Sequence, residues 1–187
     1  DNRRVLPEIN LTFGGILRDY QDEAVQRVLR NNQGVLEAST GAGKTICALA
    51  IVAARRQPCL ILVHGQELMS QWRERIQQFL SIEAGQVGAG KCDVRPVTVG
   101  IVNSVRTRLD ELVPQFGHVV VDECHRSPSS MFTETVRAFD ACYLLGLSAT
   151  PYRRDGLTKV IGFYIGPVLH RVDPARLRDI GAVLRPE

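Results

Sequence analysis

One ten-residue stretch, Leu36–Thr45, constrains the fold of this chain more than any other part of the sequence. It consists mainly of small residues, follows the apolar residue Val35, and precedes an apolar run over residues 46–52. A buried strand, a small-residue loop and a helix in direct succession form a phosphate-binding element, because the free N–H groups and the dipole of the helix start point at the anion. The stretch therefore predicts an α/β fold that holds a nucleoside triphosphate.

Individual residues of this loop have distinct expected roles. Gly41 and Gly43 adopt backbone angles that other residues avoid, so main-chain N–H groups can approach phosphate oxygens closely. We expect Lys44 to bind the β- and γ-phosphates and the Thr45 hydroxyl to bind Mg²⁺. Ala38 occupies the first loop position, where glycine is usual. The predicted cofactors are ATP and Mg²⁺, and the loop residues expected to bind them are Thr40, Gly41, Ala42, Gly43, Lys44 and Thr45. The alternative is a glycine-rich turn with no ligand.

The length and composition fit one large α/β domain. The chain has 187 residues and a formal net charge of +3, which permits nucleic-acid binding without arguing strongly for it. No apolar stretch is long enough to span a membrane, and no signal-peptide core follows residues 1–4. The five cysteines form no C-x-x-C pair, and Cys47, Cys59 and Cys142 lie in apolar segments. We therefore expect buried thiols in a cytoplasmic protein with no membrane partner.

Strand and helix patterns alternate along the chain. Amphipathic periodicity predicts helices over residues 19–29 and 66–80. Continuous apolar runs are typical of buried parallel strands, and they predict further strands over residues 59–63, 97–101, 118–121 and 143–147. Repeated β-α units predict a mostly parallel sheet with helices on both faces and ligands at the carboxyl ends of the strands. The side chains expected to face inward in the second helix are Leu68, Trp72, Ile76, Phe79 and Leu80.

Two further segments carry local signals. Residues 85–95 are glycine-rich and polar, which predicts a surface hairpin or loop. Residues 174–180 form a short helical pattern, with Asp173 as its N-cap and Gly181 as its stop.

An acidic pair, Asp122-Glu123, directly follows the strand expected over residues 118–121. A carboxylate at this position can hold Mg²⁺ through water, and a second one beside it can orient and deprotonate an attacking water. We expect Asp122 in the first role and Glu123 in the second, so that Glu123, Lys44 and Asp122 form the catalytic set. The alternative is a solvated acidic turn after a strand.

Several motifs together resemble a known family. Residues 122–125 form a DE-x-H box, residues 148–150 form a Ser-Ala-Thr motif, and residues 17–21 precede the phosphate-binding loop in the expected order. With that loop, they resemble the first motor domain of superfamily 2 helicases and translocases, over the chain from about Leu11 to its end. Residues 146–156 are most similar to XPB-like helicases and to the helicase subunits of type III restriction enzymes. The resemblance implies a RecA-like P-loop NTPase fold and ATP-driven movement on nucleic acid, usually duplex DNA.

The resemblance implies a site for adenine. Gln21 corresponds to the family glutamine that hydrogen-bonds the base, and its carboxamide offers the donor and the acceptor that the adenine edge requires. Arg18 and Phe13 are candidates to pack on the base through stacking or cation–π contact. The alternative is an amphipathic helix start with Tyr20 in the core.

The resemblance also implies a contact with the nucleic-acid backbone at His64, Gly65 and Gln66, where a helix start can offer N–H groups to a phosphate. The family has a phosphate-binding threonine where this chain has Ile101, so Asn103, two positions later, and Ser104 are expected to donate the hydrogen bonds there. The alternatives are a plain loop histidine and a strand end with polar caps. Trp72 is interpreted as a core residue.

His125 corresponds to the family histidine that links the hydrolysis site to the Ser-Ala-Thr motif, and its two ring nitrogens suit a bridging hydrogen bond. Ser148 and Thr150 are expected to relay the nucleotide state to the nucleic-acid groove. Arg153-Arg154-Asp155 departs from the charge pattern of XPB-like proteins and is interpreted as a solvated loop.

The family has a second motor domain that supplies arginines to the γ-phosphate. We expect residues 1–187 to be the first motor domain, with residues 1–16 as a lead-in and residues 168–187 approaching the link to the second. Its expected partners are duplex DNA, the C-terminal RecA-like domain of the same parent chain, and restriction or repair subunits. Alone, it is expected to bind ATP or ADP with Mg²⁺ but to hydrolyse slowly. The rival interpretations are a small-molecule kinase, a nucleotide-gated binding module and an RNA helicase domain.

Overall fold

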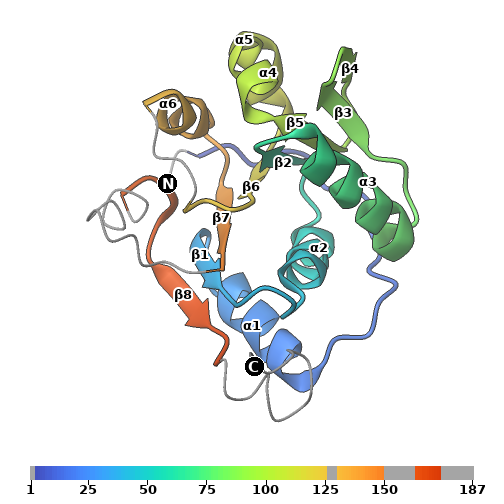
Figure 1. The fold of residues 1–187 in the computed structure, drawn as a ribbon, viewed down its shortest axis with the longest axis vertical. Coiled ribbons are helices and arrows are strands. Elements are labelled where there is room, and N and C mark those ends of the chain that lie inside the picture. Colours follow the sequence, from blue (N-terminus) through green and yellow to red (C-terminus); the bar gives the residue numbers. More distant parts are fainter. Residues whose placement is uncertain (1–2, 126–129, 150–162, 174–187) are drawn as a thin grey trace, which may run out of the picture.

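The computed structural model describes residues 3–125, 130–149 and 163–173. They form one eight-stranded sheet in the order β4-β3-β5-β2-β6-β7-β1-β8 (Figure 1). Its neighbouring strands all run parallel except β3 and β4, which form an antiparallel pair. The strands are β1 Gln33–Glu37, β2 Cys59–Val63, β3 Gly85–Gly88, β4 Lys91–Asp93, β5 Val97–Ile101, β6 His118–Val121, β7 Tyr143–Ser148 and β8 Val168–Arg171. The predicted mostly parallel sheet is therefore confirmed.

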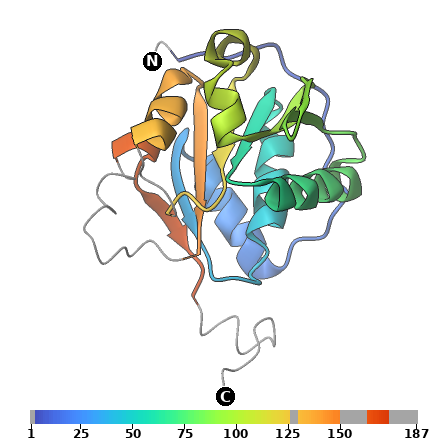
Figure 2. The ribbon, with the colours of Figure 1, turned by 45° about the horizontal axis from the view of Figure 1, so that its top comes forward.

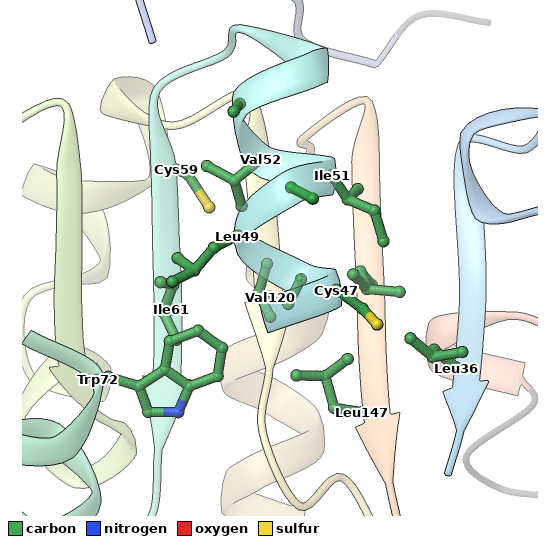
Figure 3. Close-up of a cluster of buried hydrophobic side chains, with 14 of the residues drawn as sticks. Leu36, Cys47, Leu49, Ile51, Val52, Cys59, Ile61, Trp72, Val120 and Leu147 are labelled. Atoms are coloured by element: carbon green, nitrogen blue, oxygen red, sulfur yellow. The ribbon is translucent and has the colours of Figure 1, made fainter. Parts of the chain in front are cut away.

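Helices cover both faces of the sheet, as Figure 1 shows. One face packs on α1 Asp19–Leu29, α2 Lys44–Arg55 and α3 Gln66–Leu80, and the other on α4 Val102–Arg106, α5 Leu109–Leu112, the 3₁₀ turn Val113–Gln115 and α6 Ser130–Ala138. Alternation along the central strand β2 creates these two cores, because Cys59, Ile61 and Val63 join the first and Leu60 and Leu62 the second. The first core is drawn in Figure 3. None of the described helices combines the length and the apolar content that a membrane crossing requires.

The structure corrects two details of the predicted organisation and leaves a third untested. Residues 85–95 do form a hairpin, but its first arm, β3, is buried and pairs with β5, so only part of this segment is surface. In α3, Leu68 and Phe79 are only partly buried, and Met69 takes an inward position instead. The helix predicted over residues 174–180 lies outside the described residues.

Residues 4–14 cross the domain as an extended segment and are tied to it at several points (Figure 2). Arg4 forms a two-pronged ion pair with Asp140, with N–O distances of 2.9 and 3.0 Å. The backbone N–H and C=O of Leu6 both bond to the side chain of Gln57, at 2.8 and 2.9 Å. Further along, the N–H of Gly14 donates to the carbonyl of Phe79 at 2.7 Å. This lead-in is therefore packed along the domain before it enters α1.

A polar cluster around the buried His118 lies at the end of the sheet opposite to the strand carboxyl termini. Arg55 lies with its Nη1 3.0 Å from Nε2 of His118, its Cζ 4.5 Å from the ring centroid of Tyr143, and its Nη2 2.7 Å from the carbonyl oxygen of Asn31. His118 is fully buried, and this burial, together with the nearby Arg55 charge, lowers its pKa well below the ordinary value. The imidazole is thus neutral and accepts a hydrogen bond from the guanidinium.

The buried His118 predicts a pH dependence of stability. Its pKa is depressed in the folded state, so the unfolded chain binds the extra proton as the pH falls below about 6.5, the ordinary histidine value. The free energy of unfolding is therefore expected to be full above pH 7 and to decrease toward pH 5, by roughly 1 kcal/mol per pH unit from this group. In His118→Gln, which keeps an acceptor for Arg55, this part of the slope should disappear. Urea unfolding at pH 5 to 8 measures it, and equal slopes in both proteins would contradict the assignment.

Candidate nucleotide-binding site

The phosphate-binding loop lies between the end of β1 and the start of α2, as predicted. Gly41 and Gly43 both have left-handed backbone angles, with φ of +85° and +82°. A Cβ atom placed on Gly43 would lie 2.3 Å from Nε2 of Gln21. Gly43 is therefore required on two grounds, since a side chain would be strained and would also displace the carboxamide of Gln21.

Lys44 occupies the first position of α2, and its ammonium group is held inside the loop. Its Nζ donates to the carbonyl oxygen of Ala38 at 2.8 Å and to that of Ser39 at 3.3 Å. Burial lowers the pKa of Lys44, while the charges of Glu123 and Asp122 oppose this shift. The ammonium is thus positioned near two carboxylates, and phosphate oxygens could replace the carbonyl contacts.

Asp122 follows the last residue of β6, and both of its carboxylate oxygens are hydrogen-bonded. Oδ1 accepts the backbone N–H of Glu123 at 2.9 Å, and Oδ2 accepts the indole N–H of Trp72 at 2.8 Å. Burial raises the pKa of Asp122, and the hydrogen bond from Trp72 counteracts this shift. The side chain is buried but fixed at both oxygens, which suits a group that binds a cation.

Glu123 has a φ of +51°, which is uncommon for a residue other than glycine. Such strained backbone is concentrated at functional sites. Its Oε2 lies 3.2 Å from Nε2 of His125, and Nδ1 of His125 lies 3.1 Å from Oγ of Ser148. A neutral imidazole satisfies both contacts when its Nε2–H donates to Glu123 and its Nδ1 accepts the Ser148 hydroxyl. The backbone carbonyl of Ser148 in turn accepts the N–H of Ala38 at 3.0 Å.

His125 therefore connects the acidic pair to the residue that ends β7, which is the bridge that the sequence suggested. Thr150, the other residue expected in this connection, lies outside the described residues, as does Arg153-Arg154-Asp155.

One cavity of about 420 Å³ brings most of these groups together. The predicted residues that line it are Thr40, Gly41, Gly43, Lys44, Thr45, Asp122 and Glu123. The hydroxyl of Thr45 and the carboxylate of Asp122 are hard oxygen donors at the same cavity. Mg²⁺ is usually bound through one or two protein oxygens together with substrate phosphates and waters. The donor set therefore fits a Mg²⁺–nucleotide complex.

The α3 side of this cavity consists of residues that were not assigned to the site from the sequence. They are Leu68, Gln71, Trp72 and Arg75, which follow each other at helical spacing. Trp72 was interpreted as a core residue; its ring is indeed buried, but its polar atom also contacts the site. The available signal was general, since a buried indole N–H needs a hydrogen-bond partner.

Gln21, which is expected to bind adenine, also links two elements of the structure. Oε1 of Gln21 accepts the N–H of Arg18 at 2.9 Å, and Nε2 donates to the carbonyl of Ala42 at 3.1 Å. Gln21 is buried and thereby joins the start of α1 to the phosphate-binding loop. A carboxamide retains one donor and one acceptor after these two bonds, which is what an adenine edge requires. Arg18 is exposed, whereas Phe13 stacks on Phe79 with ring centroids 5.8 Å apart.

The residues expected to contact nucleic acid gather at the carboxyl ends of β2 and β5. These strands pair in parallel with Val63 opposite Ile101, so the segments that follow them start side by side. Gly65 is the N-cap of α3, and a Cβ placed on it would meet no atom within 4 Å. Gln66 and Asn103 are exposed, while His64 stacks on Phe132 with ring centroids 5.5 Å apart. The helix α3 thus begins at this surface and lines the nucleotide cavity further along.

Comparison with known proteins identifies the family of this chain. A family model described as "Type III restriction enzyme, res subunit" matches residues 15–153, which include the phosphate-binding loop, the acidic pair and Ser148. The chain belongs to this family. The match ends within the segment that follows β7, so it covers most of the sheet and all the residues of the cavity.

The chain is also similar to curated proteins that are named as helicases and translocases. The DNA 3'-5' translocase XPB2 of Sulfurisphaera tokodaii is 39% identical over 155 residues, which are 83% of this chain and 35% of that protein. The general transcription and DNA repair factor IIH helicase/translocase subunit XPB of Danio rerio is 25% identical, over 98% of this chain and 26% of that protein. The resemblance to XPB-like and type III res-like first motor domains is thereby confirmed. The chain spans about a third of the length of the first relative and about a quarter of the length of the second.

Solved structures confirm the RecA-like fold. The Hef helicase domain of Pyrococcus furiosus superposes with a TM-score of 0.74 at 18% identity, over 87% of this chain and 39% of that chain. The SWI2/SNF2 ATPase core of Sulfolobus solfataricus, solved in complex with dsDNA, gives a TM-score of 0.69 at 18% identity, over 87% and 38% of the two chains.

Proposed function

We propose that residues 1–187 form the ATP-binding motor domain of an ATP-dependent DNA helicase or translocase. One observation carries this function: Lys44, the pair Asp122-Glu123 and the residues of the loop surround a single cavity, and His125 connects that cavity to Ser148. The names of the relatives, which include DNA translocases and helicases, support DNA as the polymer.

In this function, each group of the cavity has a defined task. The N–H groups at the start of α2 and the ammonium of Lys44 bind the phosphates. The Thr45 hydroxyl and the Asp122 carboxylate would hold Mg²⁺, which supplies charge stabilisation at the transferring phosphoryl group. Glu123 orients the attacking water and takes its proton. Gln21 contacts adenine with its remaining donor and acceptor.

His125 couples this chemistry to the rest of the domain. Its ring contacts both the base Glu123 and the hydroxyl of Ser148, so a change in the charge of Glu123 alters the hydrogen bond at the end of β7. The other expected member of this relay is Thr150. The nucleic-acid contact is assigned to His64, Gly65, Gln66 and Asn103, at the start of the helix α3 that also lines the cavity. We further propose that a second RecA-like domain completes the site and that the parent acts with restriction or repair subunits.

DNA binding at the start of α3 can be tested by adding one negative charge there. Gln66→Glu adds a negative charge at the helix N-terminus, where an acidic side chain is favourable for the helix but repels a phosphate. We expect the affinity for a fluorescein-labelled DNA duplex to fall about tenfold, as measured by anisotropy at low salt. Raising the salt concentration should weaken binding in all variants, because phosphate contacts release counterions.

The matched control is Gln77→Glu, an identical change at an exposed position three turns further along α3. It should leave the affinity nearly unchanged. Equal losses in both variants would remove the assignment of this surface, and preferential binding to RNA would favour the rival RNA helicase domain. An absence of nucleic-acid binding at low salt would favour a small-molecule kinase.

A further inference from the structure

Trp72 belongs both to the hydrophobic core and to the lining of the nucleotide cavity. It is 2% exposed and belongs to the core between α2, α3 and the sheet. Its single polar atom, Nε1, donates to Oδ2 of Asp122 at 2.8 Å, and the residue lines the nucleotide cavity. Figure 3 shows the indole beside Ile61, with its nitrogen turned toward the end at which the strand arrows point.

This hydrogen bond completes the fixation of the Asp122 carboxylate. The backbone N–H of Glu123 holds Oδ1 at 2.9 Å, so a carboxylate without the indole contact would still be free to rotate about that one bond. With both bonds made, its plane is fixed, and each oxygen keeps a lone pair for a cation or its bound water. The indole is itself held by the surrounding core, because its neighbours in the cluster are fully buried apolar side chains such as Ile61 and Ile76.

We propose that Trp72 is a positioning residue for Mg²⁺: its indole N–H holds the carboxylate of Asp122 in the orientation that binds the ion of a Mg²⁺–nucleotide complex. This inference rests on the proposed function, since it assigns Mg²⁺ to Asp122. Partners that orient a metal-binding side chain typically change metal affinity about 10- to 100-fold when they are removed. An indole N–H suits this task because it can donate but cannot itself compete for the ion.

The test compares the affinity for ADP in the presence of Mg²⁺ and in the presence of EDTA, by titration calorimetry. In Trp72→Phe, which keeps an aromatic ring but removes the donor, the gain in affinity that Mg²⁺ gives should shrink by about tenfold or more. The affinity in EDTA should remain close to that of the wild-type chain, because the loop that binds the phosphates is intact. An unchanged Mg²⁺-dependent gain would overturn the inference.

Two further variants separate positioning from general damage. Ile76→Val removes one methyl group from the next turn of α3 in the same core, and it should leave the Mg²⁺-dependent gain unchanged. In an Asp122→Asn background, Trp72→Phe should have no additional effect on that gain, because the carboxylate that the indole orients is already absent. Additive losses in the double variant would overturn the inference. Failure of the wild-type chain to bind ADP with Mg²⁺ would instead refute the proposed nucleotide site.

A spectroscopic measurement needs no change to Trp72 and covers the case in which Trp72→Phe does not fold. The chain contains one tryptophan, so a ¹⁵N-labelled sample gives a single indole N–H resonance. We expect this resonance to shift when Asp122 is replaced with asparagine, and to shift on addition of ADP with Mg²⁺ more than on addition of ADP with EDTA. A resonance that responds equally to ADP with and without Mg²⁺ would contradict the positioning role.

Discussion

Replacing Glu123 with glutamine is expected to lower ATP turnover by about 10²- to 10⁴-fold, the usual contribution of a positioned general base. The backbone of Glu123 is strained, with a positive φ. Its carboxylate lies 3.2 Å from the ring of His125 and lines the cavity together with Lys44 and Asp122. Glutamine has nearly the same shape but cannot accept the proton of water. Nucleotide affinity should therefore remain within a few-fold of the wild-type value, since the phosphate loop and the Mg²⁺ side of the cavity are unchanged.

Turnover is measured as phosphate release with saturating ATP and duplex DNA. The sample is the longest natural polypeptide that contains residues 1–187. Titration calorimetry with ADP and Mg²⁺ gives the affinity. The control is Glu74→Gln, the same change at an exposed position on α3, which should leave turnover unaffected. If Glu123→Gln retained turnover within threefold of the wild type, Glu123 would not be the base.

Replacing Lys44 with alanine is expected to lower the affinity for ATP by about 10²-fold or more while leaving the domain folded. Hydrogen bonds from an ammonium to charged oxygens contribute about 1.5–3 kcal/mol each, and Lys44 is expected to bind two phosphates. The folded chain should tolerate the change, because burial already disfavours this charge, as the lowered pKa of Lys44 indicates. The change leaves the carbonyls of Ala38 and Ser39 without their ammonium partner, which limits any gain in stability.

Two measurements on the same samples decide this prediction. Calorimetric titration with ATP and Mg²⁺ reports the affinity, and thermal unfolding reports the stability. Lys91→Ala, an exposed lysine on β4, is the matched control and should change neither quantity. A Lys44→Ala chain that binds ATP as tightly as the wild type would show that the loop does not hold the triphosphate in the expected way.

The elements that surround the site follow from local patterns, and the sequence therefore predicted them closely. The helix over 66–80 and the strands over 59–63 and 118–121 have the bounds that their periodicity indicated. Because the strands are parallel, the residues after their carboxyl ends must meet at one edge of the sheet. For this reason the sequence alone predicts that the phosphate loop, the acidic pair and Ser148 lie at one site.

Other features depend on contacts between segments that are far apart in the chain. The indole of Trp72 donates a hydrogen bond to Asp122, which is 50 positions away in the sequence. An amphipathic helix pattern predicts that Trp72 faces inward, but it does not predict the direction of its one polar atom. The carboxamide of Gln21 bonds to Ala42 only because α1 packs beside the loop. The burial of β3 was missed for a related reason, since its glycine-rich sequence becomes buried only through its pairing with β4 on one side and β5 on the other.

The central claim is that this domain couples ATP hydrolysis to contact with DNA, and ATP turnover with and without duplex DNA tests it most directly. The measurement uses the longest natural polypeptide that contains residues 1–187, at low salt and again at higher salt. We predict that duplex DNA raises the rate of phosphate release at least tenfold at low salt, that the stimulation weakens as salt increases, and that it is lost in Glu123→Gln. A rate that is the same with and without nucleic acid, or transfer of the γ-phosphate to a small molecule in place of water, would contradict the claim.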